Sequence, residues 1–222
     1  MKLLAFDTAT DVCTVAVWVD GAVCEREETG QRHAERILVM IDDALADAGV
    51  ALRDLNAIAF GRGPGSFTGL RISAGVAQGL AFAAGLPVVP VSSLAALAQG
   101  VDAPRVLAAL DARMQQVYWG AYARNAAGLV ALEGTELVVA PADVPSPAGS
   151  GWIGTGSGWD RYADTLQRRV GDRLTRWLPG RSPRARFIAE IAAPEVRAGR
   201  TVVPEQALPV YLRDEVAAKK RA

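Results

Sequence analysis

The sequence has 222 residues, of which 50% are hydrophobic and 22% are charged, with 24 basic and 24 acidic side chains. This composition excludes a disordered or fibrous chain and leaves room for one large domain or two small ones. A protein that itself gripped a phosphate backbone would usually be basic, so zero net charge argues against a main role in holding nucleic acid.

The first 30 residues predict a three-stranded meander. Apolar residues alternate along the second strand, and Asp20-Gly21 then forms a two-residue hairpin turn. In that register Cys13 and Cys24 lie roughly 13 Å apart, which is too far for a disulfide. The expected strands are residues 2–6, 12–19 and 22–28.

A helix, a strand, a glycine-rich loop and a second helix follow. The first helix has an apolar stripe at helical spacing and closes at Gly49. The expected elements are a helix from His33 to Ala48, a strand at 57–60, a loop at 61–69 and a helix at 70–84.

The second half repeats this order. Its first strand ends at Asp111, as the first strand of the chain ends at Asp7, and a glycine-rich loop again precedes a helix. The expected elements are strands at 106–110, 117–123 and 129–139, a loop at 154–158 and a helix near 161–169.

The same order in both halves favours duplication. Two meander-plus-helix units that face each other describe, by analogy of fold, an α/β protein of the actin-like (ASKHA, RNase H-like) class with two duplicated mixed-sheet subdomains. We expect an N-terminal subdomain at residues 1–100 and a C-terminal one at residues 101–222.

The strand-end aspartates are candidates for a nucleotide site. In actin-like enzymes the turn after the first strand holds magnesium and phosphate through an aspartate, hydroxyls and N–H groups. The alternative is an aspartate and threonines that only satisfy a hairpin turn. The candidate nucleotide-binding residues are Asp7, Thr8, Gly63, Gly65, Asp111, Gly154 and Gly156.

The glycine-rich loop from Gly61 to Arg71 is neither a P-loop nor a Rossmann fingerprint, because it lacks Gly-Lys-Ser/Thr and Pro64 interrupts it. Ser66 or Thr68 can cap the following helix, whose N-terminus would attract an anion. The alternative is a tight turn that needs glycine for packing alone.

The helix after this loop carries no charge from Ile72 to Ala84. A helix that is apolar all round must be covered on every side, and small residues four apart permit close helix–helix approach. The sequence leaves two alternatives for what covers this helix: another subunit, or the rest of this chain.

Arginines concentrate in the last third of the chain, where residues 161–222 carry a net charge of +7 against −7 for residues 1–160. They indicate either a docking face for RNA or an acidic partner, or a solvated surface. The arginines in question are Arg161, Arg168, Arg169, Arg173, Arg176, Arg181, Arg184 and Arg186.

The sequence lacks the residues that a histidine-based metal site or a catalytic triad would need. His33 is the one histidine, so an H-x-x-x-H or two-histidine metal site cannot form within one chain. We expect no catalytic residue and no metal ligand, with His33 as a cap or contact residue. The first residues turn polar too soon for a signal peptide, and Ile72–Leu86 is shorter than a membrane span of about 20 residues, so we expect a cytoplasmic protein without membrane contact.

Four motifs make this sequence similar to the TsaB (YeaZ) family: LLAFDTAT at the start, GPGSFTGLRIS (Gly63–Ser73), LDARMQQVYW (Leu110–Trp119) and PVYLRDEVA (Pro209–Ala217). They follow the family's order along nearly the whole chain. The GPGSFTGLR run is the most specific, and residues 129–200 carry few signature positions.

The resemblance implies a non-catalytic partner of the paralogous transferase TsaD in tRNA threonylcarbamoyladenosine synthesis. It implies a TsaD heterodimer, TsaE in a larger assembly, a homodimer when alone, indirect contact with tRNA, and ATP-Mg in the complex rather than as a cofactor of this chain. The first two helices would form the interface. The expected interface residues are His33, Ile37, Ile41, Arg71, Gly75, Ala77, Gln78 and Leu80.

TsaD carries an H-x-x-x-H motif just after a P-x-x-P-V strand. The matching strand here begins at Pro87, and alignment places Ser93 and Leu97 at the two histidine positions. A hydroxyl and a leucine cannot replace two imidazoles on a metal ion. The rival interpretations are an independent actin-like ATPase or small-molecule kinase that uses Asp7 and Asp111, and a glycoprotease, against which the missing metal ligands argue.

Overall fold

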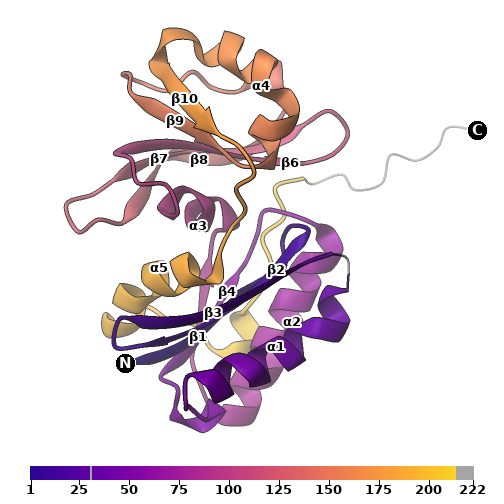
Figure 1. Cartoon of the computed structure of the whole chain (residues 1–222), viewed down its shortest axis with the longest axis vertical. Coiled ribbons are helices and arrows are strands. Elements are labelled where there is room, and N and C mark those ends of the chain that lie inside the picture. Colours follow the sequence, from indigo (N-terminus) through magenta and orange to yellow (C-terminus); the bar gives the residue numbers. More distant parts are fainter. Residues whose placement is uncertain (31, 214–222) are drawn as a thin grey trace, which may run out of the picture.

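The chain forms two five-stranded sheets, one below the other in Figure 1. The computed structural model describes residues 1–30 and 32–213. The first sheet has the order β3-β2-β1-β4-β5, in which the meander is antiparallel and β4 and β5 add to it in parallel. Its strands are β1 (Lys2–Asp7), β2 (Val12–Val19), β3 (Ala22–Thr29), β4 (Ala57–Gly61) and β5 (Val88–Val91).

The second sheet repeats this topology in the order β10-β9-β6-β7-β8, so β6, like β1, lies in its centre. The duplicated mixed sheets and the actin-like α/β architecture predicted from the sequence are thereby confirmed. The strands are β6 (Arg105–Asp111), β7 (Val117–Arg124), β8 (Val130–Val139), β9 (Trp152–Thr155) and β10 (Leu174–Leu178).

The first hairpin has the predicted turn and register. Asp20 and Gly21 both adopt positive φ angles, 50° and 99°, as a two-residue turn between twisted strands requires. Cys24 pairs with Val17 and Cys13 with Glu28, and both cysteines are free thiols. Burial raises the pKa of the Cys13 thiol to about 12, so it is a core residue and not a nucleophile.

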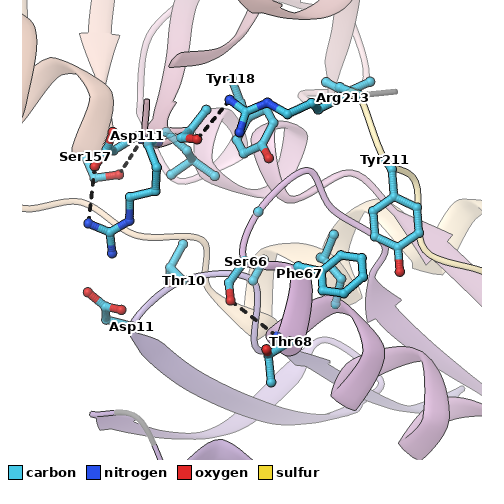
Figure 2. Close-up of a pocket in the computed structure, with 18 of the residues that line it drawn as sticks. Thr10, Asp11, Ser66, Phe67, Thr68, Asp111, Tyr118, Ser157, Tyr211 and Arg213 are labelled. Carbon is cyan, nitrogen blue, oxygen red and sulfur yellow. Dashed lines mark hydrogen bonds and ion pairs between the residues drawn. The ribbon is translucent and has the colours of Figure 1, made fainter. Parts of the chain in front are cut away.

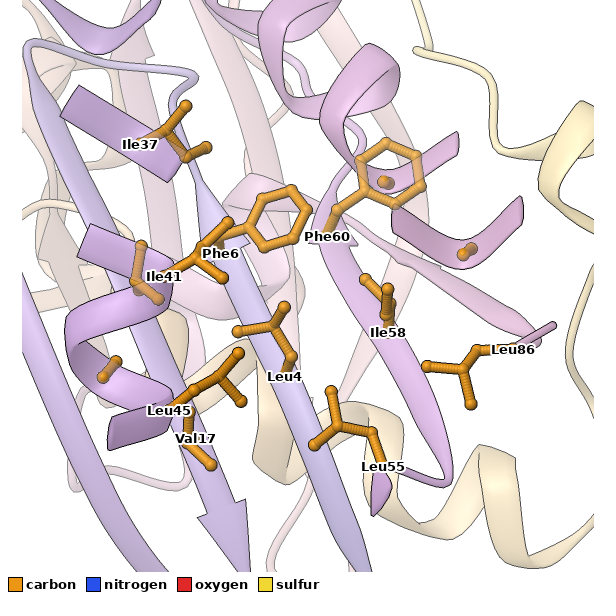
Figure 3. Packing of buried hydrophobic residues seen from close by; sticks show 14 of the residues in the cluster. Leu4, Phe6, Val17, Ile37, Ile41, Leu45, Leu55, Ile58, Phe60 and Leu86 are labelled. Atoms are coloured by element: carbon orange, nitrogen blue, oxygen red, sulfur yellow. The ribbon is translucent and has the colours of Figure 1, made fainter. Parts of the chain in front are cut away.

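Helices cover both faces of the first sheet. On one face, α1 (His33–Asp47) and α2 (Phe67–Ala84) bury apolar side chains against the strands, as the predicted stripe on α1 requires (Figure 3). On the other face lies α5 (Ala185–Arg197), which packs alanines on alanines of the sheet and so approaches it closely.

The position of α5 corrects the expected domain boundary. We expected residues 101–222 to form one unit, but α5 packs on β1, β2, β4 and β5 of the first sheet. The second subdomain is therefore an insertion between β5 and α5, and the chain returns to the first subdomain near residue 184. The tail motif Pro209–Ala217 lies within the described residues only as far as Arg213.

The second sheet lies between α3 (Ser93–Gln99), which faces the first subdomain, and α4 (Ser157–Val170) on its outer face. Both α2 and α4 begin three or four residues earlier than predicted. Ser66 explains the earlier start of α2, because its Oγ accepts a hydrogen bond from the N–H of Gly69 at 3.4 Å. Four 3-10 turns complete the described elements: η1 (Leu52–Asp54), η2 (Pro141–Asp143), η3 (Gly171–Arg173) and η4 (Pro204–Gln206).

None of the helices within residues 1–30 and 32–213 is both long enough and apolar enough to cross a membrane.

Candidate functional site

A cavity of about 660 Å³ lies between the two subdomains, at the carboxyl ends of β1 and β6 (Figure 2). Ligands bind at such strand ends in open α/β sheets, and this volume suits a small molecule. One wall comes from the turn after β1 and the start of α2, and the opposite wall from the loop after β6. The C-terminal segment closes one side with Val210, Tyr211, Leu212 and Arg213.

Polar side chains, among them the hydroxyl groups of Thr10, Ser66 and Thr68, lie on the lower wall in Figure 2. Thr10 and Asp11 follow β1, and Ser66 and Thr68 surround the N-terminus of α2. The first turn of a helix presents unpaired N–H groups and a partial positive charge, so this wall suits an anionic group. Gly65, a predicted nucleotide-binding residue, also lines this wall.

Asp111 lies on the opposite wall, as predicted, but its carboxylate is already paired. Its Oδ2 lies 3.3 Å from a guanidinium nitrogen of Arg161 and 3.6 Å from one of Arg113. Its backbone N–H donates to the Oγ of Ser157 at 3.0 Å. Of these two arginines only Arg113 lines the cavity, so this wall offers its guanidinium to a ligand, and the aspartate orients it.

Asp7 is sealed beneath the cavity and does not line it. Its carboxylate accepts hydrogen bonds from the Oγ of Ser93 and the N–H of Ala9, both at 2.6 Å. Gly61 lies directly against it, because a Cβ there would come within 1.8 Å of Oδ2. Burial raises the pKa of Asp7 to about 6, against the opposing effect of these hydrogen bonds. In this conformation Asp7 cannot reach a metal-bound water, which corrects its predicted role.

Thr8 also points away from the cavity. Its Oγ1 donates to the carbonyl of Gly69 at 2.7 Å and lies 2.8 Å from the Oγ of Ser73, so it fastens the β1 turn to α2. Three other predicted nucleotide-binding residues, Gly63, Gly154 and Gly156, do not line the cavity either.

Those glycines are explained by close packing. A Cβ on Gly154 would meet the indole of Trp159 at 2.5 Å, and one on Gly156 would meet the carbonyl of Ala109 at 2.3 Å. Gly63 has a φ of 102°, which side-chain-bearing residues rarely adopt. The packing alternative for these loops is therefore the one that the structure favours at these positions.

Three cavity residues escaped the sequence reasoning: Tyr118, Tyr211 and Arg213. All three stand in motifs that carried the family resemblance, but nothing in their spacing places them near the strand-end aspartates. Burial raises the pKa of the Tyr118 phenol, which therefore stays protonated and able to donate a hydrogen bond.

A second candidate site is the outward surface of α1 and α2, which lie side by side on the first sheet. Phe82 on α2 is 75% exposed and Leu38 on α1 is 50% exposed, and Val39, which follows Leu38 in sequence, is exposed as well. Gly75 and Gly79 are also exposed, and a Cβ at either would meet nothing within 4 Å. The charge-free helix is thus not wholly covered by the part of the chain that the structure describes. Contiguous exposed apolar side chains mark interaction surfaces.

Several expected interface residues are buried in this subdomain instead. Ile37, Ile41 and Ala77 are almost fully buried in the core beneath α1 and α2, so they cannot contact a partner in this conformation. The apolar stripe of α1 faces the sheet, so Ile37 and Ile41, which the family resemblance assigned to the interface, belong to the core in this structure. Gln78 donates from Nε2 to the carbonyl of Ala207 at 3.2 Å.

The remaining expected interface residues divide between surface and interior. Arg71 is exposed and its guanidinium lies 3.7 Å from the ring centre of Phe67. Leu80 is half-buried against the core, and Gly75 is open to solvent. His33 is half-buried, with Nε2 2.8 Å from the carbonyl oxygen of Thr10, and it lines the cavity as well.

The arginine-rich third contains both paired and exposed side chains. Arg184 forms ion pairs with Glu25 and Glu27 of β3, which bind the start of α5 to the first sheet. Arg169 donates to the carbonyl of Val144 at 2.8 Å. All members of the set except the half-buried Arg184 are exposed: Arg161, Arg168, Arg169, Arg173, Arg176, Arg181 and Arg186.

Comparison with known proteins resolves the family. The chain is 45% identical to tRNA threonylcarbamoyladenosine biosynthesis protein TsaB of Escherichia coli, over 99% of this chain and 98% of that protein. It is 38% identical to the TsaB of Haemophilus influenzae, over 99% and 97% of the two chains. The chain belongs to the TsaB (YeaZ) family.

Structure agrees with this assignment. The solved structure of YeaZ from Pseudomonas aeruginosa superposes with a TM-score of 0.87 at 45% identity, covering 95% of this chain and 99% of that one. A family model described as TsaD, tRNA N6-adenosine threonylcarbamoyltransferase, also matches residues 26–219. The chain is therefore also similar in sequence to that transferase family over most of its length.

The two positions that align with the TsaD histidines lie on one face of α3 in this TsaB-family chain. Ser93 contacts Asp7, and Leu97 is buried in the core of the second sheet. Within residues 1–30 and 32–213, no three His, Cys, Asp or Glu side chains converge as a metal site would need.

Proposed function

We propose that this chain is a non-catalytic subunit of the tRNA threonylcarbamoyladenosine synthesis machinery, which binds TsaD through α1 and α2 and activates it. In this proposal TsaE joins the larger assembly, ATP-Mg acts in the complex, and tRNA is contacted indirectly. When TsaD is absent, the same surface pairs two copies of this chain. The names of the curated relatives and the full-length match to them support the pathway.

The observation that carries the proposal is the uncharged, small-residue surface on α2. Gly75 and Gly79 present exposed backbone without side chains, and Phe82 stands exposed near the end of the helix. Small residues let a second helix approach closely, and an exposed phenylalanine supplies the apolar anchor that interfaces favour. On α1, Leu38 is a further exposed apolar side chain.

The residues of α3 support a model in which TsaD, and not this chain, carries out the metal-dependent transfer. A metal ion in the TsaD-like position would need two nitrogen ligands, and this chain supplies Ser93, which is already bonded to Asp7, and the apolar Leu97. The residues present do not fit such an ion. Threonylcarbamoyl transfer therefore belongs to the partner.

The proposal is tested with Gly79→Arg. A Cβ there would meet no atom within 4 Å in the isolated chain, the position is exposed, and arginine replaces a poor helix former, so the fold should remain intact. In a complex it would place a charge in a closely packed helix interface, and we expect TsaD affinity to fall by about 100-fold or more. Calorimetric binding to TsaD and tRNA modification by the reconstituted system measure both effects.

Leu132→Arg is the matched control. Leu132 is 42% exposed on β8 of the second sheet, away from α1 and α2, and its replacement should leave TsaD binding unchanged. Wild-type affinity of a folded Gly79→Arg variant would reject the α2 interface.

An independent actin-like ATPase or kinase remains the second candidate, favoured by the size of the cleft and by Asp111 on its wall. It predicts magnesium-dependent ATP turnover by the purified chain without TsaD. Against it stands Asp7, which is buried and bonded where a kinase needs an accessible carboxylate. The subunit proposal predicts little turnover alone and strong stimulation of TsaD on mixing.

A further inference from the structure

Within the described residues, the segment after α5 leaves the subdomain to which it returned. After α5 and the η4 turn it runs beside α2 and then up to the second sheet (Figure 1). We call residues 207–213 the strap. Four of its residues, Val210 to Arg213, line the cavity between the subdomains.

Two contacts fix the lower part of the strap on the first subdomain. Ala207 is fully buried, and its carbonyl accepts a hydrogen bond from Nε2 of Gln78 on α2. The N–H of Val210 donates to the carbonyl of Arg62 at 2.8 Å, so the glycine-rich loop after β4 holds the strap as well.

An aromatic contact carries the strap past the mouth of the cavity. The ring of Tyr211 lies 5.4 Å from that of Phe67, the first residue of α2, and Arg71 covers the Phe67 ring. Aromatic pairs at this separation are favourable, and this one lies at the cavity wall (Figure 2).

Arg213 makes the contacts with the second subdomain. Its guanidinium donates to the carbonyl of Ala112 at 3.1 Å and to Oε1 of Gln116 at 2.5 Å, and it lies 3.3 Å from the sulfur of Met114. The partners are 97 to 101 residues away in sequence. A planar guanidinium can serve two acceptors at once, as this geometry requires.

The loop that Arg213 grips has an unusual backbone. Arg113, Met114 and Gln115 have φ angles of 61°, 50° and 59°, three consecutive left-handed residues none of which is glycine. Such residues persist only where surrounding contacts hold them, and they gather at ligand-binding and switch regions. The grip of Arg213 on both ends of this turn is one of those contacts.

The subdomains are also joined on the α3 side, through contacts that do not involve the strap. There Gln99 binds both Glu190 of α5 and the backbone of Val130. The contacts at α3 would keep the two subdomains joined on one side if the strap were released. The subdomains could then move apart on the other side, where the cavity lies.

We propose that the strap is a latch across the cleft: Arg213 holds the 112–116 loop against the first subdomain, and its release opens the cavity. The inference does not depend on which ligand or partner the protein takes. It assigns Arg213 a positioning role at the cavity wall.

Hydrogen–deuterium exchange of the full chain tests the latch with Arg213→Ala. We expect amide exchange in residues 112–116 and 10–12 to rise about tenfold or more, while exchange in the centres of β1 and β6 stays unchanged. Arg213→Lys keeps the positive charge but lacks the planar guanidinium group, so the rise in amide exchange should be intermediate between wild type and Arg213→Ala. Arg197→Ala, at another exposed arginine on α5, is the matched control and should change nothing.

Gln116→Ala removes the other end of the contact and should reproduce the local rise. The proposal is overturned if Arg213→Ala leaves exchange at both cavity walls within about twofold of the wild type. It is equally overturned if the rise is as large in β1 and β6 as at the cavity, since Arg213 would then stabilise the fold in general.

Discussion

At the scale of single residues, Asp7 has an unusual place for a strand-end carboxylate. It is fully buried, receives two hydrogen bonds, and has a pKa raised by burial to about 6. Both protonation states of this carboxyl group are costly. The ionised form is a buried charge that two hydrogen-bond donors stabilise only in part, and the protonated form accepts weaker hydrogen bonds from the same donors.

This balance predicts a pH-dependent effect of Asp7→Asn. Because the folded pKa lies above the unfolded value of 3.8, the native state binds the proton more tightly, and wild-type stability falls as pH rises from about 4 to 6. Asparagine keeps the shape and does not titrate. We expect it to be more stable than wild type by up to about 3 kcal/mol at pH 8, with the difference shrinking towards pH 4.

Thermal unfolding of both proteins across that pH range measures the effect. Asp102→Asn, at an exposed aspartate, controls for the loss of one charge. A variant Asp7→Asn that is less stable than wild type at pH 8 would contradict the expectation, because the ionised carboxylate would then be a net stabilising group.

Residue types could predict Asp7 and Asp111 as strand-end groups, but not which of them faces the cavity. That outcome depends on Gly61, which lets the backbone lie against the Asp7 carboxylate, and on Ser93 from a helix 86 residues away in sequence. Sequence spacing does not encode either contact.

At the scale of elements, α2 uses glycine for two different purposes. Gly69 faces inward, where an added Cβ would lie 1.8 Å from the carbonyl oxygen of Thr8. Gly79 faces outward, where an added Cβ would meet nothing within 4 Å. The composition of the helix predicted its close packing, but a glycine that packs against its own subdomain cannot be told from one that is open to a partner without the structure.

The two glycines should therefore respond in opposite ways to alanine. Gly69→Ala forces the backbone turn after β1 away from α2, and we expect it to lower the free energy of unfolding by about 1–3 kcal/mol. Gly79→Ala removes a flexible residue from an exposed helix position and should raise it by about 0.5–1 kcal/mol. Urea denaturation of both variants measures the difference, and equal effects of the same sign would refute this assignment of faces.

At the scale of the whole molecule, the second subdomain is an insertion into the first. Repeated strand order made the two sheets predictable, because meanders and parallel additions follow from local periodicity. The same periodicity could not predict that the chain returns to the first sheet. Both α5 and the sheet surface that it covers are lined with alanine, and alanine on a helix does not indicate which sheet the helix packs on. Ion pairs from Arg184 to Glu25 and Glu27 reinforce this docking, and charge counts alone had suggested an external role for the arginine.

The insertion predicts how the chain will tolerate division. A fragment of residues 1–100 lacks α5 and leaves the small-residue face around Ala5, Ala16 and Ala59 bare, so we expect no cooperative thermal transition by circular dichroism. Replacing residues 101–182 by a short glycine–serine linker keeps α5 and the strap on the first sheet, and this shortened protein should melt cooperatively. If the 1–100 fragment alone showed a cooperative transition, α1 and α2 would suffice to fold the first sheet. The stability of the first subdomain would then not depend on α5, even though α5 packs on its sheet.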